Sequence, residues 1–382
     1  MYHILHIFLD EKFFDNVASF FDAIPNIKNH YYFYTSSKNY RFRYIRDYHK
    51  VQLVFNKKEY NKILGSGNYD IVYLHSLAPM YYDYVLRINK KAKVIWWAWG
   101  YDLYSPMRAC SPLLNIDLYK SETNKYIRSQ NHNFNLISII RRIYHRITYL
   151  SDYIKRRRVV SRMDYFSPVL SLEYYIMRDN CKYFRAKPFM LQCGPGVAKQ
   201  YDLKYFTSPG NILVGNSLTF TNNHLDIFNS IASCHRTKSQ QFIVPINYGC
   251  DLDKVYIKSR FDVPNVLWLE DFMPKDEYFA MFDTITHAVF GTMRQQAMGN
   301  IFYCLGHGVK VYLYADSIIY KHLLSQGYIV YKVEDITDDS FLYPLDYDAS
   351  ITNCKLVNEM HSDSINYAYK EIMKLMDSAL TN

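Results

Sequence analysis

The sequence lacks the long apolar run that a membrane-spanning helix requires. Such a helix needs about 20 consecutive apolar residues, and no stretch among the 382 residues approaches that length. The start, MYHILHIFLDEKFF, also lacks the basic segment and the small-residue cleavage site of a secretory signal. We therefore expect a cytoplasmic protein.

Paired cysteines are missing as well. The seven cysteines are an odd number and contain no Cys-x-x-Cys pair. Disulfide-stapled domains and zinc sites use closely spaced pairs of cysteines. We expect reduced thiols and no metal site.

Two phosphate-binding signatures are absent. The chain contains neither GxGxxG nor GxxxxGK[ST], which disfavours dinucleotide and P-loop chemistry. No acidic Asp-x-Asp pair ends a predicted strand at a place comparable to the polar segments discussed below, so the sequence does not demand a divalent metal. We expect an activity that needs no cofactor.

The sequence does contain short apolar runs that alternate with longer amphipathic stretches. This pattern predicts an α/β fold with two Rossmann-like domains, each with a parallel sheet. The hydrophobic content of 49% can supply a core for each domain. We expect an N-terminal domain over 1–190 with a basic helical insert, a second domain over 205–363, and a C-terminal helix over 364–382 that packs back toward the first domain.

The predicted strands place polar residues at strand ends. The strands are expected at 1–9, 30–36, 69–77, 93–100 and 163–169 in the first half, and at 211–217, 240–249, 266–272, 287–291 and 310–314 in the second. Open parallel sheets bind ligands outside the carboxyl ends of their strands. We expect the two domains to face each other across a ligand-binding cleft.

The net charge of +9 is unevenly distributed. Residues 141–162, RRIYHRITYLSDYIKRRRVVSR, carry eight Lys or Arg against one Asp. This pattern is typical of a basic amphipathic helix, which can lie on an anionic membrane surface or simply present a charged face to water. The charges would also suit nucleic acid, but no nucleic-acid-binding signature accompanies them, so we expect no such partner.

The stretch ILVGNSLTFTNNHLDIF places Gly215, Asn216 and Ser217 between a predicted strand and a helix. Backbone N–H groups and small polar side chains at such a helix start can bind an anion. Alternatively, Asn216 and Ser217 serve only the turn, and Asn222 caps the helix. His224, one turn further, fits a packing histidine as well as a ligand contact.

A second polar segment, RQQAMGN, follows the predicted strand 287–291. Arg294 offers a planar guanidinium suited to phosphate, Gln295 and Gln296 offer neutral donors, and Asn300 opens the next helix. Two such helix starts in one domain predict a diphosphate-bearing donor, whose leaving group the cation and the helix dipoles would stabilise. A surface ion pair is the alternative for Arg294.

In the first half, VIWWAWGYDLYS ends a predicted strand with Trp99, Gly100, Asp102 and Tyr104. Aromatic rings offer flat surfaces to sugars, and a carboxylate at a strand end can accept a proton. Asp102 is therefore the candidate base or acceptor anchor. Tryptophans that pack a core, with Asp102 as a cap, are the alternative.

Two histidines, His6 and His75, also lie at the ends of predicted strands in this half. Both could face a ligand at the same sheet edge. Each could equally be a hydrogen-bonded core histidine.

Several motifs in order resemble the family of 4-acetamido-4,6-dideoxygalactose (Fuc4NAc) transferases. They are WWAWGYDLY, ILVGNS followed by NNHLDI, VPINYG, LEDFMPKDEYFAMF and RQQAMGNIFYCLGHGVKV. The resemblance extends over about 210–315 and, locally, 93–104. It implies a GT-B glycosyltransferase at the inner face of the bacterial cytoplasmic membrane, which moves the sugar from a dTDP donor to an undecaprenyl-linked glycan.

The resemblance also implies roles for individual residues. It places on the acceptor side Trp99, Gly100, Asp102 and Tyr104, which His6 and His75 would accompany. It places on the donor side Gly215, Asn216, Ser217, Asn223, His224, Pro245, Tyr248, Gly249, Glu270, Phe272, Arg294, Gln295, Gln296, Asn300 and Tyr303.

One feature departs from many retaining GT-B enzymes, which carry two glutamates eight positions apart in the last of these motifs. With Gly308 aligned, Gln295 and Tyr303 stand at the two positions. The sequence leaves open whether the anomeric configuration is retained or inverted, whether the donor is dTDP- or UDP-linked, and whether the acceptor belongs to common antigen, O-antigen or capsule. A catalytically silent, membrane-docked binding protein is the alternative from a different class.

Overall fold

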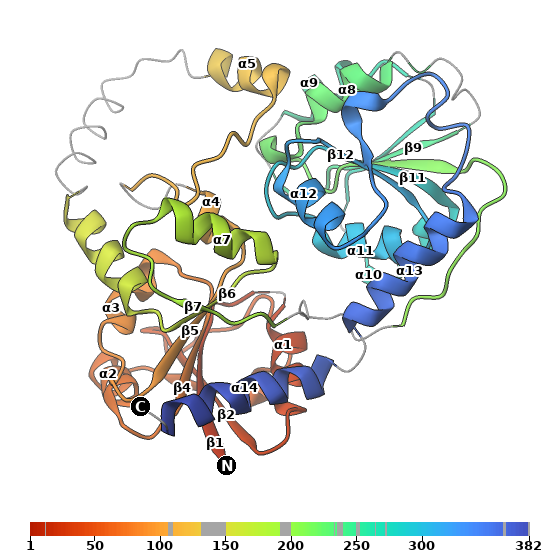
Figure 1. Cartoon of the computed structure of the whole chain (residues 1–382). Coiled ribbons are helices and arrows are strands. Elements are labelled where there is room, and N and C mark those ends of the chain that lie inside the picture. The colour runs from red at the N-terminus through yellow and green to blue at the C-terminus, as the bar shows by residue number, and fades with distance from the viewer. Residues whose placement is uncertain are drawn as a thin grey trace. The chain divides into compact units, whose positions relative to one another are not determined.

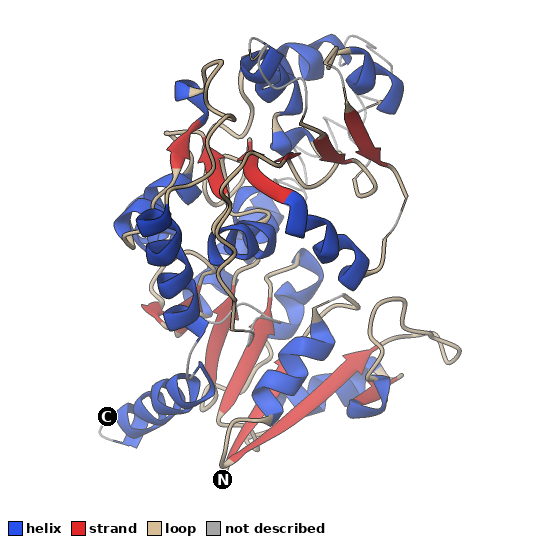
Figure 2. Cartoon of the chain, turned by 90° about the vertical axis from the view of Figure 1, so that its right-hand side faces the viewer, coloured by secondary structure: helices blue, strands red, loops and turns tan. Residues whose placement is uncertain are grey.

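The computed structural model describes residues 1–11, 13–105, 110–130, 150–191, 200–232, 234, 240–249, 253–263, 265–271, 273–361 and 364–380. They form two units, each with its own parallel sheet (Figure 1 and Figure 2). Of the described residues, the first unit comprises 1–115, 150–191 and 364–380, and the second comprises 116–130 and 200–361.

The sheet of the first unit has seven strands in the order β3-β2-β1-β4-β5-β6-β7, all parallel. The strands are β1 (Tyr2–Ile7), β2 (Ile27–Tyr34), β3 (Val51–Val54), β4 (Ile71–His75), β5 (Lys93–Trp97), β6 (Tyr165–Ser167) and β7 (Lys187–Pro188). The strand order reverses between β1 and β4, and ligands of open α/β sheets bind at such a point.

The helices of the first unit are α1 (Phe14–Asp22), α2 (Lys57–Gly65), α3 (Tyr82–Val85), α4 (Tyr101–Tyr104), the helix 150–162, α7 (Ser171–Asn180) and α14 (Ser364–Leu380). α14, from the C-terminal end, joins the N-terminal core. Its Ala368 and Ile372 are buried in one cluster with Ile4 and Phe21. Burial of this apolar helix face explains why the chain returns to the first unit.

The sheet of the second unit has six strands in the order β10-β9-β8-β11-β12-β13, again all parallel. The strands are β8 (Asn211–Val214), β9 (Phe242–Pro245), β10 (Val266–Leu269), β11 (Ile285–Phe290), β12 (Lys310–Leu313) and β13 (Tyr331–Lys332). β8 and β11 are neighbours at the reversal of this order, so their carboxyl ends flank the expected ligand position.

The helices of the second unit are α5 (Ser121–Gln130), α8 (His224–Ala232), α9 (Lys254–Ser259), α10 (Lys275–Ala280), α11 (Met298–Gly306), α12 (Ile318–Ser325) and α13 (Tyr347–His361). Ile227 and Phe228 of α8 pack against Val214 and Val289 in the core. This packing fixes the start of α8 beside the carboxyl ends of β8 and β11.

α5 belongs to the second unit, although residues 116–130 lie between β5 and β6 in the sequence. Its Tyr126 packs against the apolar cluster of the second unit. The observed units therefore differ from the predicted domain over 1–190, because this segment buries its apolar face on the other core.

Candidate functional site

The turn after β8 begins at Gly215, which has φ of +69°. Its N–H donates to the carbonyl of Val289 in β11 over 2.8 Å. The ring of the buried His224 lies against Gly215, so a Cβ there would approach Nε2 of His224 to 2.5 Å. Burial lowers the pKa of His224 to about 4 and keeps the ring neutral. The neutral ring of His224 thus packs against the backbone of the turn at Gly215.

The side chain of Asn222 organises this turn. Its Oδ1 accepts from the N–H of Asn216 over 3.2 Å. Its Nδ2 donates to the carbonyl of Ser217 over 2.9 Å, to the Ser217 hydroxyl over 2.8 Å and to Oγ1 of Thr219 over 3.0 Å. Asn222 is fully buried, so these bonds hold Asn216 and Ser217 in one geometry.

Gln296 joins this turn to the loop that follows β11. Its Oε1 accepts from the hydroxyl of Thr221 over 2.7 Å, and its Nε2 donates to Thr219 over 3.2 Å and to Oδ1 of Asn216 over 3.4 Å. The structure therefore brings Asn216, Ser217 and Gln296 together. The Gln296 amide, predicted as a ligand donor, bonds protein groups instead.

The other members of the RQQAMGN segment lie around the start of α11. Arg294 is half-buried, and one guanidinium nitrogen donates to the carbonyl of Gln295 over 3.0 Å. Asn300 donates to the hydroxyl of Tyr278 on α10 over 2.9 Å. The ring of Tyr303 stacks on Phe279 with centroids 4.3 Å apart. Asn300 and Tyr303 therefore contribute to packing α11 against α10.

The loop after β9 lies against the same turn. The carbonyl of Tyr248 accepts from the N–H of Leu218 over 2.6 Å. Gly249 has φ of +88°, and a Cβ there would approach Thr219 to 2.8 Å. Pro245 is buried where β9 ends. This part of the predicted donor side thus supports the turn after β8.

Glu270, expected near a nucleobase, is bound by lysines of α9 instead. It forms ion pairs with Lys258 and, over 3.6 Å, with Lys254. The hydrogen bond from Lys258 lowers the pKa of the Glu270 carboxyl. These ion pairs explain its position without a ligand. Phe272 lies outside the described residues.

In the first unit, Asp102 is buried and accepts hydrogen bonds from fixed donors. One oxygen accepts from the Leu77 N–H and from the indole of Trp96, both over 2.8 Å, and the other accepts from the Trp99 N–H over 2.9 Å. Burial raises the pKa of Asp102, and these donors oppose that rise. Asp102 therefore ties the carboxyl end of β5 to that of β4.

The neighbours of Asp102 also make structural contacts. Gly100 has φ of +82° and begins α4. The hydroxyl of Tyr104 donates to the buried carboxylate of Glu173 over 2.7 Å. Trp99 packs beside Phe13 and Trp97. Trp99 is therefore better placed than Tyr104 to meet a ligand.

His6 and His75 form a buried hydrogen-bonded pair. Nδ1 of His6 lies 2.9 Å from Nε2 of His75, and Nε2 of His6 lies 3.0 Å from Oδ1 of Asn29. Burial lowers the pKa of His6 to about 4 and that of His75 well below its ordinary value. Within the described structure, Nδ1 of His75 is buried without a hydrogen-bond partner.

No family model matches the chain, and no curated protein sequence matches it. Solved structures do match over its whole length. The apo form of the lipopolysaccharide outer core galactosyltransferase WaaB has a TM-score of 0.56 at 11% identity and covers 98% of this chain and 99% of its own. Sucrose-phosphate synthase from Thermosynechococcus elongatus has a TM-score of 0.57 at 8% identity, with 100% of both chains covered.

A third match is a candidate UDP-N-acetylglucosamine 2-epimerase from Listeria monocytogenes. It has a TM-score of 0.51 at 10% identity and covers 99% of this chain and 97% of its own. The chain has the GT-B fold. This confirms the predicted fold of two Rossmann-like domains.

In this GT-B chain, sequence reasoning assigned no role to Thr219 and Thr221. It offered Asn222 only as a helix cap, whereas the side chain of Asn222 binds the turn after β8. All three stand in the sequence LTFTNN, where two threonines alternate with apolar residues and two asparagines follow immediately before a helix. That alternation was the available signal, because a buried turn needs side chains that satisfy its own backbone.

Proposed function

We propose that the protein is a glycosyltransferase that moves a sugar from a nucleoside diphosphate to a lipid-linked glycan. The observation that carries this proposal is the polar turn at the strand-order reversal of the second sheet. Asn222 and Gln296 hold Asn216 and Ser217 together there, between the carboxyl ends of β8 and β11. A fixed polar turn at this position of an α/β sheet suits a phosphate-bearing ligand.

The diphosphate would be bound from two sides. The backbone of the turn after β8 supplies one side, and Arg294 with the start of α11 supplies the other. A guanidinium stabilises two phosphate oxygens at once, and the helix start adds partial positive charge. The interactions of the diphosphate with the guanidinium and with the helix start would both strengthen as the diphosphate leaves and its negative charge grows.

The acceptor would be bound at the carboxyl ends of β4 and β5 in the first unit. Among the described residues, Nδ1 of His75, Nε1 of Trp99 and the hydroxyl of Tyr81 are buried without a hydrogen-bond partner. Such atoms are rare and cost about 1–3 kcal/mol each. Acceptor hydroxyls would satisfy them, with Trp99 offering a ring to the sugar. Asp102 would position this edge and would not act as the base.

The finer identity rests on the motif resemblance. A dTDP-linked deoxyamino sugar such as Fuc4NAc is the proposed donor, and an undecaprenyl-linked oligosaccharide of a bacterial surface polysaccharide is the proposed acceptor. A UDP-linked sugar is the alternative donor.

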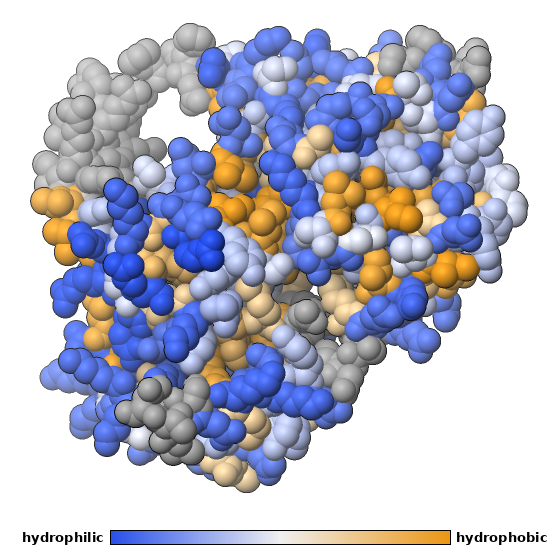
Figure 3. Space-filling model, viewed as in Figure 1, coloured by the Kyte–Doolittle hydropathy of each residue, from blue (hydrophilic) through white to orange (hydrophobic). Residues whose placement is uncertain are grey.

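We propose that the helix 150–162 carries the protein to the inner face of the membrane. Leu150 and Ile154 lie four residues apart, Arg157 and Arg158 follow Ile154 by three and four residues, and all four side chains are exposed. Apolar surface covers the first turn of this helix, at the left-hand edge of Figure 3. Exposed apolar side chains flanked by arginines fit an anionic lipid surface.

Other basic residues of this helix are engaged within the fold. Lys155 forms an ion pair with Asp83 over 2.8 Å, and the buried Arg156 donates to the carbonyl of Ser111. Residues 141–149, the first part of the predicted basic helix, lie outside the described residues. No described helix is both long enough and apolar enough to cross a bilayer.

The first experiment measures thermal unfolding with dTDP, UDP, GDP and ADP. A ligand at 100 times its Kd stabilises the folded protein by about 3 kcal/mol, so the correct nucleotide raises Tm. Arg294→Ala should reduce affinity by about 2–4 kcal/mol, whereas Arg178→Ala on α7 should leave it unchanged. Turnover is then measured with the sugar-linked nucleotide and a short lipid-linked acceptor.

Absence of a shift with every nucleotide, together with binding to phosphatidylglycerol vesicles, would favour a catalytically silent membrane-docked protein. Membrane attachment has its own test. Arg157→Ala with Arg158→Ala should reduce binding to phosphatidylglycerol vesicles, whereas Arg178→Ala should not. Equal binding of all three proteins would refute the lipid-facing role of the helix.

A further inference from the structure

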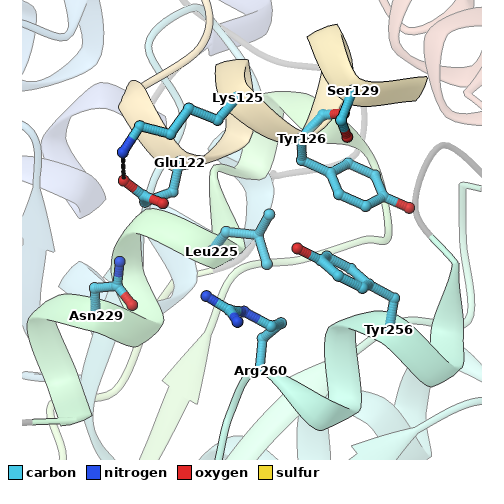
Figure 4. Close-up of a pocket in the computed structure, with 8 residues that line it drawn as sticks. All are labelled: Glu122, Lys125, Tyr126, Ser129, Leu225, Asn229, Tyr256 and Arg260. Carbon is cyan, nitrogen blue, oxygen red and sulfur yellow. Dashed lines mark hydrogen bonds and ion pairs between the residues drawn. The ribbon is translucent and has the colours of Figure 1, made fainter. Parts of the chain in front are cut away.

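The helix α5 comes from the first half of the chain but belongs to the second unit. Its start is hydrogen-bonded to α8, and its later turns line a pocket. A pocket of about 210 Å³ lies between α5, α8 and the end of α9. Figure 4 shows the side chains that line it. The ring of Tyr126 stacks on that of Tyr256 beside it, with centroids 4.4 Å apart. The middle of α5 lines this pocket, whereas the hydrogen bonds that join the segment to the start of α8 lie at residues 118–123. We call these residues the docking segment.

Asp226, in the first turn of α8, binds one end of the docking segment. Its Oδ1 accepts from the N–H of Glu122 over 2.8 Å. Its Oδ2 accepts from the N–H of Thr123 over 3.0 Å and from the Thr123 hydroxyl over 2.7 Å. Asp226 and Thr123 are both buried. Charge-assisted bonds to the start of α5 therefore fix it to the start of α8.

Asn223 binds the other end of the docking segment. Its Oδ1 accepts from the N–H of Lys120 over 2.9 Å, and its Nδ2 donates to the carbonyl of Leu118 over 3.1 Å. The same Nδ2 donates to the carbonyl of Gly291, at the end of β11, over 2.7 Å. Asn223 is fully buried with φ of +50°. Its side chain thus joins the docking segment to the loop after β11.

Lys120 adds a third attachment, at the carboxyl end of β12. Its ammonium group lies 4.4 Å from the ring centroid of Tyr314 and 2.8 Å from a carboxylate oxygen of Asp316. The docking segment therefore contacts the residues after β12 directly, in addition to the start of α8, and it is linked to the end of β11 through Asn223.

We propose that the docking segment, through Asn223 and Asp226, positions the turn after β8, which is the proposed binding site of the donor diphosphate. Asn223 follows Asn222, the residue that holds Asn216 and Ser217. A left-handed backbone is unfavourable for most residues, so contacts of the Asn223 side chain decide how firmly it is held. The donor-binding site of the second unit is then complete only when residues 118–123, from the first half of the chain, are bound to it. This proposal rests on the proposed function.

The main test variant is Thr123→Val, which keeps the side-chain shape and removes one bond to the buried Asp226. Thr123→Ser restores the hydroxyl and should restore the wild-type behaviour. Asn223→Gly is a second variant, because glycine adopts the left-handed backbone freely while the three side-chain bonds are lost. Lys125→Ala is the matched control on α5, since the exposed Lys125 pairs only with the half-buried Glu122 among the described residues.

Three quantities are measured for each variant. We expect Thr123→Val and Asn223→Gly to raise KM for the nucleotide sugar, and Kd for the nucleoside diphosphate, about tenfold with kcat within about twofold. Hydrogen exchange should accelerate at residues 215–223 and stay unchanged in β10. Lys125→Ala and Thr123→Ser should match the wild type.

The outcomes separate this proposal from the proposed function. If the wild type binds no nucleoside diphosphate, the proposed function fails, and hydrogen exchange at 215–223 still tests the positioning. If the wild type binds and both folded variants bind and exchange like it, the positioning role is overturned. A variant that fails to fold is replaced by the other, because the two remove different bonds.

Discussion

Gly215 and His224 are packed so closely that a methyl group on Gly215 would lie 2.5 Å from Nε2 of His224. The backbone at Gly215 also has φ of +69°, which disfavours a side chain. We expect Gly215→Ala to lower the free energy of unfolding by about 2–3 kcal/mol and to weaken nucleotide binding, because the turn must shift. Urea unfolding and calorimetric titration measure the two effects.

A matched control and a double variant separate the causes. A Cβ on Gly299 meets no atom within 4 Å, so Gly299→Ala in α11 should be neutral or stabilising. Combining Gly215→Ala with His224→Ala should cost less than the sum of the two single variants, since the clash is gone. Strict additivity would show that the contact between the two residues does not limit the turn.

Asn222 is expected to matter more for binding than any other polar side chain of the turn. Asn222→Ala removes four hydrogen bonds to Asn216, Ser217 and Thr219. We expect nucleotide affinity to fall at least tenfold and stability to fall by about 2 kcal/mol. Asn211→Ala, at the amino end of β8, changes an asparagine away from the turn and should leave the affinity unchanged. Equal affinities would place the ligand elsewhere.

Asp102→Asn distinguishes a positioning carboxylate from a base. The amide offers one acceptor oxygen, and its NH2 group would face an N–H donor of Leu77, Trp96 or Trp99. We expect stability to fall by about 2–4 kcal/mol, while the pH dependence of kcat/KM stays as in the wild type at temperatures where the variant is folded. If the acidic limb of the profile of kcat/KM against pH disappeared while stability stayed as in the wild type, Asp102 would be the base.

The alternation of apolar and amphipathic stretches was sufficient to predict the fold. Strands such as β4, β5, β8, β9 and β11 are short, buried and rich in Val, Ile and Leu, so their sequence pattern is distinct. The half-buried edge strand β3 and the attachment of α5 to the second unit were not predicted. The attachment depends on bonds between Thr123 and Asp226, which are 103 residues apart in sequence.

The sequence identified the segments that form the candidate site better than it identified the role of each residue in them. The sequence placed Gly215, Asn216, Ser217 and Gln296 after two strands of one domain, and the ends of these strands lie side by side in the sheet. Their roles as ligand contacts stay predictions. It could not show that Gln296 bonds to Thr219 and Thr221, or that Asp102 bonds to three donors. Such assignments depend on side-chain directions that periodicity does not fix.

Buried neutral histidines should make the protein sensitive to mild acid. Burial lowers the pKa of His287 to about 4, and the same cause acts on His6, His224 and His322. The unfolded chain binds these protons near pH 6.5, whereas the folded chain does not. Their stabilising effect is therefore complete above pH 6.5 and is lost as pH falls from there toward 4, by about 1.4 kcal/mol per pH unit for each residue.

His287→Gln isolates one of these contributions. The amide can still donate to the carbonyl of Tyr343, which now lies 3.0 Å from Nε2 of His287, but it cannot bind a proton. We expect the free energy of unfolding to fall less steeply between pH 6.5 and 5 than in the wild type, as measured by urea unfolding at each pH. His49→Gln changes an exposed histidine and should keep the wild-type slope. A slope for His287→Gln equal to that of the wild type would mean that folding does not change the pKa of His287, which would contradict its burial as a neutral ring.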